Sequence, residues 1–350
     1  MTQIKIPSNR MLITLLICML PVILLENIKS ADKQTFLYEF VSTFVGIAAS
    51  AVLFCLVYVS QKYTKCADVR CLYRKTVVGS FVTALIYCVY FVWLISYILL
   101  KYSDMFSKKF NQNASLFGIG LILLIVCAYS SYKGANAIAR CALIISVITA
   151  VSLLLIFCGN ILNIDLSVAD FGFSGNPSGF FDVMSNTFSI SFTAVICLVL
   201  QNKSEKFKLR SVFVLFAAAL LIFTAFAFFI RFALGSYAYM QEYPGFLLSK
   251  SSLLGSVGGI EGLYLFVSTI SVFILVSLCL CCIKKSAFNT NGKHYLLFIL
   301  PTAILLFCAQ NIESVRDVLT NQIILNIMTV VVSLVLPAIN LALYRRDTNV

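Results

Sequence analysis

The sequence predicts an all-α polytopic membrane protein with ten transmembrane helices. Of its 350 residues, 61% are hydrophobic and only 11% are charged, whereas a soluble domain carries about 25% charged residues. The apolar residues form long continuous runs, unlike the short alternating segments of a membrane β-barrel. Because each transmembrane helix needs about 20 apolar residues, the composition suffices for ten. It excludes a soluble or a disordered chain.

Ten apolar runs define the predicted helices, and residues 1–350 are expected to form a single transmembrane domain. The connections are too short to hold a soluble domain. The longest one, 233–259, is rich in Gly, Ser and Tyr and is predicted to be an extracytoplasmic loop. The runs lie at about 11–28, 36–60, 76–100, 115–132, 138–162, 181–201, 212–232, 260–283, 294–310 and 322–344.

The net charge of +12 is explained by orientation in the membrane. Of the 26 Lys and Arg residues, 18 fall on the side that holds both termini and eight on the other. Cytoplasmic loops are enriched in Lys and Arg, so both termini are predicted to be cytoplasmic. The charge therefore indicates contact with the lipid bilayer, and no nucleic-acid partner is expected.

The first run has a second interpretation. Lys5 and Arg10, the apolar core that follows and Ser30-Ala31 resemble a signal peptide. Glu26 and Lys29 occupy the positions where a small-residue cleavage motif belongs, which favours a retained helix. The remaining topology is the same in both cases.

The sequence shows no pattern of a catalytic or cofactor site. Its single histidine, His294, lies at the edge of the ninth run, and no P-loop, H-E-x-x-H or G-x-S-x-G motif is present. Cys66 and Cys71 have a C-x₄-C spacing with no nearby His, which is a weak metal pattern. Most other cysteines lie in apolar runs as small hydrophobes. We therefore expect no enzyme, no cofactor and no metal.

Polar residues inside the runs are the candidate functional groups, because they are costly in lipid unless they face the bundle interior. They form stripes of hydroxyls, tyrosines and amides at helical spacing. One interpretation is helix–helix packing, with hydroxyls bonded to their own helix. The other is a shared polar cavity near the membrane midplane. The stripes comprise Tyr87, Tyr90 and Tyr97; Ser185, Ser189, Thr193, Cys197 and Gln201; Tyr264, Ser268 and Ser271; and Ser333, Pro337 and Asn340.

Two further residues of the first runs allow alternative interpretations. Pro21 either kinks its helix or breaks it and exposes backbone groups to a ligand. Glu39 is either a proton-linked carboxylate or a residue that reaches to the outer surface. The predicted ligand-binding residues are Cys18, Pro21, Tyr87, Tyr90, Ser189, Ser191, Thr193, Tyr264, Ser268 and Thr269.

Three local features, together with the ten-run layout, recur in a known family. They are the segment Gly134-Ala-Asn-Ala-Ile138-Ala139-Arg140 before the fifth run, the basic run Lys203 to Arg210, and Tyr243-Pro244. With these features the chain resembles the permease-like B subunit of Ger-type spore germinant receptors. That family is a branch of the amino acid–polyamine–organocation superfamily, and the resemblance covers nearly the whole chain.

The resemblance implies a LeuT-like fold with inverted repeats over about 11–162 and 181–344. The first and sixth helices would be broken around a central site for a small germinant: an amino acid, sugar or nucleoside. The implied partners are the A and C receptor subunits, and the implied location is the inner spore membrane. An amino acid transporter coupled to protons or sodium is the alternative, since one fold serves both roles. A scaffold without a ligand is a third possibility.

The chain departs from this family at both expected helix breaks. Relatives have a glycine-rich break in the first run, whereas Ile17-Cys18-Met19-Leu20-Pro21 contains no glycine. Relatives often carry Gly-x-Glu in the sixth run, where this chain has Ser191-Phe192-Thr193. These departures bear directly on the type of ligand.

Overall fold

The computed structural model describes residues 6–25, 35–64, 77–110, 115–165, 174–200, 209–254, 257–288 and 297–338. Cys66, Cys71, His294 and half of the basic residues used for orientation lie outside these ranges. The elements are α1 (Ser8–Leu25), α2 (Phe36–Thr64), α3 (Val77–Lys109), α4 (Leu116–Lys133), α5 (Ala135–Asn160), α6 (Pro177–Phe188), α7 (Phe192–Leu200), α8 (Leu209–Leu234), α9 (Pro244–Ser251), β1 (Leu253–Leu254), β2 (Val257–Gly258), α10 (Glu261–Phe288), α11 (Ile299–Asn311), α12 (Glu313–Thr320) and α13 (Gln322–Val330).

The described residues contain eight helical segments that are long and apolar enough to cross a membrane, at the first eight predicted positions. The bent pair α12–α13 passes the same test as one unit with a 48° bend. At the ninth predicted position α11 has only 13 residues, and the preceding 291–296 lie outside the described part. Ten spans therefore remain a prediction.

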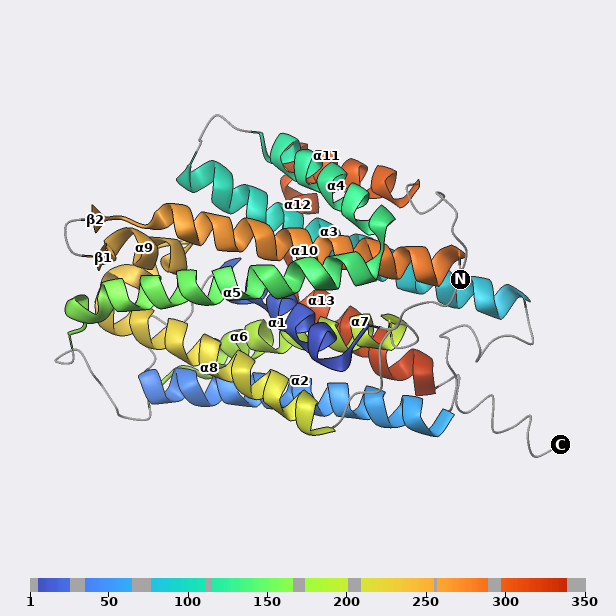
Figure 1. Cartoon of the computed structure of the whole chain (residues 1–350), viewed down its shortest axis with the longest axis horizontal. Helices are drawn as coiled ribbons and strands as arrows, with labels where there is room; N and C mark the ends of the chain where they lie inside the picture. The colour runs from blue at the N-terminus through green and yellow to red at the C-terminus, as the bar shows by residue number, and fades with distance from the viewer. Residues whose placement is uncertain are drawn as a thin grey trace.

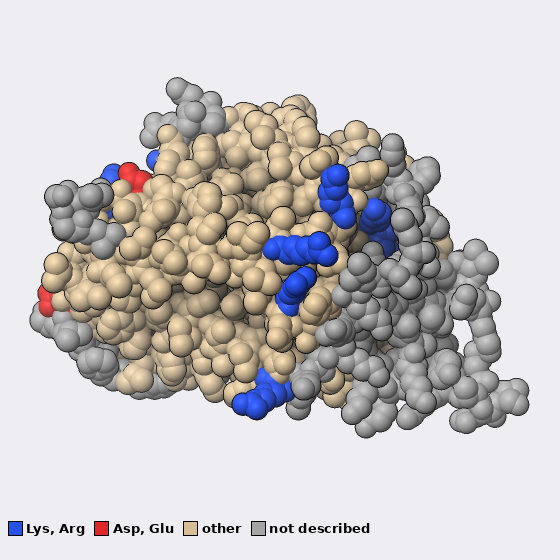
Figure 2. Space-filling model, viewed as in Figure 1, with Lys and Arg blue, Asp and Glu red and all other residues tan. Residues whose placement is uncertain are grey.

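The surface of the bundle is apolar in a way that requires lipid. Large aliphatic and aromatic side chains on α4, α5, α8 and α11 are exposed, for example Ile122 at 67%, Phe213 at 77% and Leu300 at 66%. Most of the tan surface in Figure 2 carries no charged residue; most of the blue side chains lie near its centre and to the right of it, and the red ones lie at its left edge. A water-soluble monomer does not expose continuous apolar surface of this extent. The chain is a multi-pass membrane protein.

The helices form two groups joined by α1 and α5 (Figure 1). One group packs α2 against α6 and α8, and the other packs α3 against α4, α10 and α11. Between them, α1 contacts α5, α8 and α10. This arrangement places the sixth span, α6–α7, next to α2 and near α1.

The joint between α4 and α5 is the single residue Gly134. Its φ of 94° lies in the left-handed region that favours glycine, and its N–H donates to the Ser131 carbonyl at the end of α4. Gly134 also begins the segment that resembles the germinant-receptor family. The structure explains why a glycine occupies this position, because a side chain there would strain the turn.

The prediction that the first helix is broken is wrong. Helix α1 runs without interruption from Ser8 to Leu25 and contains Pro21. Proline removes one backbone hydrogen bond, but packed neighbours and local adjustments allow transmembrane helices to continue through it. All residues from Ile17 to Val22 are buried against the bundle, and this packing keeps the helix continuous.

The long connection 233–259 is largely folded. It contains a 3₁₀ turn (Gly235–Met240), the helix α9 and the two-residue hairpin β1–β2. Its residues Tyr243 and Leu248 are 1% and 0% exposed, and Asn160 at the end of α5 donates to the Leu248 carbonyl at 2.9 Å. The connection therefore packs into one end of the bundle.

Candidate functional site

The sixth span, Pro177–Leu200, is one continuous span that tightens to a 3₁₀ turn in its middle. Between α6 and α7 lies the 3₁₀ turn Ser189–Ser191, called here the break. The Ser189 hydroxyl donates to the Asn186 carbonyl at 2.5 Å, and Thr193 donates to the Ile190 carbonyl at 2.8 Å. The Ser191 hydroxyl is fully buried and has no hydrogen-bond partner among the described residues. The break thus holds one unmet polar group in the bundle interior.

Helix α13 lines the sixth span with amide and hydroxyl side chains. The Gln322 amide donates to the Ser189 hydroxyl at 3.0 Å, and the Asn326 amide donates to the Ser185 hydroxyl and carbonyl at 2.9 and 2.8 Å. The Asn326 side-chain oxygen is buried, and no group in the described part of the chain forms a hydrogen bond with it. Together with Thr329, these residues form what we call the seam.

Two tyrosines of α3 close the seam from the other side. Because the Thr329 hydroxyl donates to the Leu325 carbonyl at 2.8 Å, Tyr90 donates to Thr329 across 2.9 Å. Tyr87 donates to the Val332 carbonyl at 3.2 Å. Val332 belongs to a π-helical turn, Val331–Val335, and such turns are frequent at functional sites.

The predicted residues on α10 have different roles. Tyr264 donates to the Leu24 carbonyl near the end of α1. Ser268 and Thr269 both donate to the Leu265 carbonyl of their own helix, at 2.9 and 2.7 Å. Ser268 therefore matches the first interpretation of the stripes, in which a hydroxyl bonds to its own helix.

The ten predicted ligand-binding residues are all described, and they do not form one cluster. The break holds two of them, Thr193 follows in α7, and the two α3 tyrosines meet the seam beside it. Tyr264 joins α10 to α1, and Thr269 accepts a 2.6 Å bond from Tyr102 of α3. Cys18 and Pro21 are buried in the unbroken α1. Ligand binding by these residues remains a prediction.

Sequence reasoning missed three members of the seam. Gln322, Asn326 and Thr329 are spaced by four and three residues, so they share one face of α13. The stripe in the tenth run was defined from Ser333 onward, and Ser333 continues the same face. The spacing was therefore visible in the sequence, and what was missing was its extension towards the start of the run.

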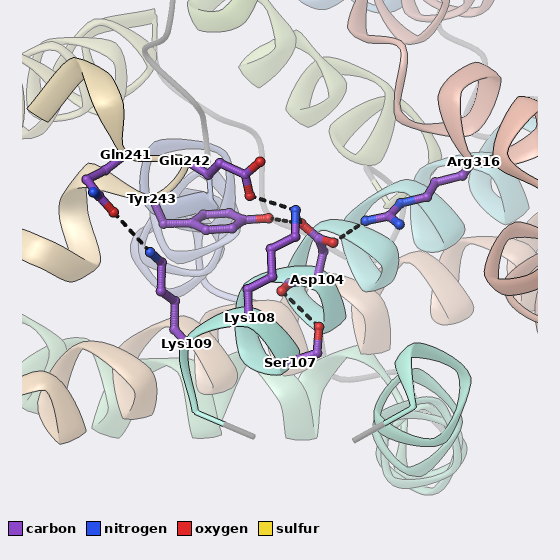
Figure 3. Close-up of polar contacts among 8 residues, drawn as sticks. All are labelled: Asp104, Ser107, Lys108, Lys109, Gln241, Glu242, Tyr243 and Arg316. Atoms are coloured by element: carbon purple, nitrogen blue, oxygen red, sulfur yellow. Dashed lines mark hydrogen bonds and ion pairs between the residues drawn. The ribbon is translucent and has the colours of Figure 1, made fainter. Parts of the chain in front are cut away.

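A charged cluster joins three elements at the end of the bundle that carries α9 (Figure 3). Asp104 of α3 accepts a 2.6 Å hydrogen bond from Tyr243 and pairs with Arg316 of α12. Lys108 lies 3.0 Å from the Asp104 carboxylate and 2.6 Å from that of Glu242. We call these five residues the Asp104 network.

Tyr243 acts as a permanent donor in this network. Burial raises the pKa of its phenol well above the usual range, and the neighbouring Asp104 carboxylate adds to this shift. The phenol therefore keeps its proton at any physiological pH. Tyr243 belongs to the Tyr-Pro pair of the family resemblance, and its structural role is to hold the 241–243 segment against α3.

Glu39 does not reach the outer surface, which was one of the two interpretations of this residue. Its side chain is 5% exposed and pairs with Arg231 of α8, with 3.4 Å between Oε2 and Nη1. The pair lies inside the membrane-spanning segments of α2 and α8. Such residues are rare in transmembrane helices and mark functional positions.

Comparison with solved structures identifies the fold. The chain aligns over 94% of its length with 77% of a structure described as the substrate-bound outward-open state of a Na⁺-coupled sialic acid symporter, with a TM-score of 0.63. The chain shares its fold with this symporter. Their sequences are 12% identical, so the likeness concerns the fold alone. No protein-family model and no curated protein match the chain in sequence.

Proposed function

We propose that this chain binds a small polar solute at the break of the sixth span, as the permease-like subunit of a spore germinant receptor. The observation that carries the proposal is that the break and the seam each hold a buried hydrogen-bonding atom without a partner among the described residues, Ser191 Oγ and Asn326 Oδ1. A buried polar group without a partner costs about 1–3 kcal/mol. A solute that bonds to these atoms recovers this energy on binding.

The chemistry of the seam indicates a solute without net charge. Its side chains are amides, hydroxyls and phenols, which exchange neutral hydrogen bonds. A sugar, a nucleoside or a zwitterionic amino acid presents matching donors and acceptors. These are the germinant classes that the family resemblance implies, and the A and C subunits and the inner spore membrane follow from the same resemblance.

A secondary transporter is the second candidate. It is favoured by the fold shared with a Na⁺-coupled symporter, because transport folds bind their solutes near the membrane midplane beside interrupted helices. The two candidates predict the same site. They differ in whether binding is followed by movement of the solute across the membrane.

The binding test uses the full chain in detergent and a panel of amino acids, hexoses and nucleosides. The chain has one tryptophan, Trp93 on α3, so its fluorescence reports on one place, three residues from Tyr90. We expect a saturable fluorescence change with one class of solute. The variant S191A should weaken binding at least tenfold. S146A is the matched control, because that hydroxyl of α5 bonds only within its own helix, to Leu143.

Uptake into vesicles separates the two functions. A receptor subunit should bind the solute and show no concentrative uptake under a proton or sodium gradient, whereas a transporter should accumulate it. In a spore-forming host, deletion of the gene should abolish germination triggered by that nutrient. Normal germination after deletion, or no saturable binding by any class in the panel, would contradict the proposal.

A further inference from the structure

The buried pair Glu39–Arg231 stands beside a cavity at the α9 end of the bundle. Helix α2 begins at this end (Figure 1), and Glu39 lies in its first turn. The carboxylate oxygen Oε2 faces Arg231, and among the described residues the other oxygen has no hydrogen-bond partner. One half of the carboxylate is therefore free to accept a proton.

The cavity gives small species access to this carboxylate. Its volume is about 40 Å³, and one water needs about 10–15 Å³ of such volume. The polar part of its wall consists of Glu39, Thr43, Asn186 and Thr187, and its apolar part comes from α1, α6, α8 and α9. The space holds water or a small ion and is too small for an organic solute.

A continuous helix face connects Glu39 to the break. Thr43, Gly46 and Ser50 follow Glu39 at spacings of four, three and four, so they lie along one side of α2. Ser50 donates to the carbonyl of Phe188, the last residue before the break, at 3.1 Å. At Gly46, a Cβ atom would lie 2.0 Å from the Thr187 hydroxyl. A shift of α2 therefore acts directly on the break.

Few of the charged groups in the described part of the chain lie around Glu39. From α8 the facing group is Arg231, and Asp165 approaches the same region through its N–H, which donates to the Phe232 carbonyl at 2.9 Å. On α6 and α9 the charged residues Asp182 and Lys250 are exposed. Residues 26–34, which follow α1, contain four charged side chains and lie outside the described part.

We propose that Glu39 is a proton-binding site that couples the outer solution to the solute site at the break. A hydronium ion in the cavity transfers its proton to the carboxylate and leaves as water. The neutral carboxyl no longer attracts the Arg231 guanidinium, so the contact between α2 and α8 weakens. This proposal rests on the proposed solute site, but protonation of Glu39 is measurable without any solute.

A proton fits this site better than a metal cation. Carboxylate, hydroxyl and amide oxygens are also ligands for Na⁺, but the guanidinium 3.4 Å from the carboxylate repels a second cation. Protonation needs no extra room and removes the attraction to Arg231 in one step. Sodium is therefore the competing outcome of the test.

The test is infrared difference spectroscopy of the full chain in phosphatidylethanolamine–phosphatidylglycerol vesicles. Lowering the pH from about 8 to about 5 spans the usual range of perturbed carboxyl groups. The wild-type chain should gain the C=O band of a buried protonated carboxyl, and E39Q should lose this band completely. D182N, which removes an exposed carboxylate of α6, is the matched control and should keep it.

The partner residue gives an independent variant. R231Q removes the cation that favours the ionised carboxylate, so the band should appear at a pH about one unit or more higher. R231K keeps a positive charge and should stay close to the wild type. An unchanged band in E39Q overturns the proposal, and so does a band that responds to Na⁺ at constant pH.

The outcomes separate this inference from the proposed function. If E39Q loses the band and the wild-type chain binds no solute of the panel, the proton site is supported and the solute site is contradicted. Solute binding with the band unchanged in E39Q contradicts the proton site alone.

Discussion

The Asp104 network and the seam both join helices that are far apart in sequence, but they do so with opposite chemistry. In the network, one carboxylate is bound by a phenol, a guanidinium and an ammonium group. In the seam, neutral amides and hydroxyls pair, and the Asn326 oxygen stays without a partner. The Asp104 carboxylate is already bound by three partners, whereas the Asn326 amide oxygen can still accept a hydrogen bond from a ligand. The network therefore fixes structure and the seam is suited to binding.

The largest effect should come from the variant D104N. It removes the charge that holds Arg316, which is 33% exposed, and Lys108. Loss of one partner of a buried pair costs about 3–5 kcal/mol, and the partial exposure of Arg316 reduces this to about 2–3 kcal/mol. Chemical unfolding of the full chain in detergent measures the change.

K108M is the control for this variant. The Lys108 side chain is 42% exposed, so its ion pairs contribute at most about 1 kcal/mol. Equal destabilisation by the two variants would show that Asp104 is not the centre of the network.

The next effect concerns the phenol that reaches into the network. Y243F deletes one hydrogen bond to a carboxylate, which is worth about 1.5–2 kcal/mol. The double variant with D104N should cost less than the sum of the two single variants, because D104N weakens the same 2.6 Å contact that Y243F removes. If the losses of stability in the two single variants add up in the double variant, the contact contributes no measurable energy.

A smaller loss is expected in the seam from Y90F. Thr329 keeps its own bond to the Leu325 carbonyl, so only one neutral hydrogen bond is lost, about 1 kcal/mol. Thermal unfolding in the same detergent measures it. A cost as large as that of D104N would erase the difference between the two regions.

The smallest effect on stability, and the sharpest contrast, should come from S191A. Its hydroxyl has no partner in the structure, so its removal should leave stability unchanged or raise it by up to about 1 kcal/mol. The same variant should weaken solute binding at least tenfold, which corresponds to about 1.4 kcal/mol. Destabilisation by S191A would show that the hydroxyl is already satisfied.

The positions of the spans follow from the sequence because apolar length is a local property. The first eight predicted runs coincide with helices, and an interruption of the sixth was expected only from the family resemblance. The unbroken α1 was not, since a proline signals a lost hydrogen bond but not the neighbours that stabilise the helix around it. The helix α12 was missed because its Glu313 and Arg316 mark it as polar.

Pairings between distant residues could not be predicted in the same way. Asp104 and Arg316 are 212 positions apart, and Glu39 and Arg231 are 192 apart. Each of these residues alone is a charge near the end of an apolar run, where lipid headgroups or water are equally good neighbours. Only the packing of α3 on α12, and of α2 on α8, decides between these environments.

Helix α3 carries a member of each region. Tyr90 at the seam and Asp104 in the network are 14 residues apart on one uninterrupted helix, a distance of about 21 Å at 1.5 Å per residue. A hydrogen-bonded helix transmits an axial displacement with little loss along its length. Helix α3 therefore connects the outer ion pairs rigidly to the inner amides. Trp93 lies between the two regions, so its fluorescence should report movement of either one.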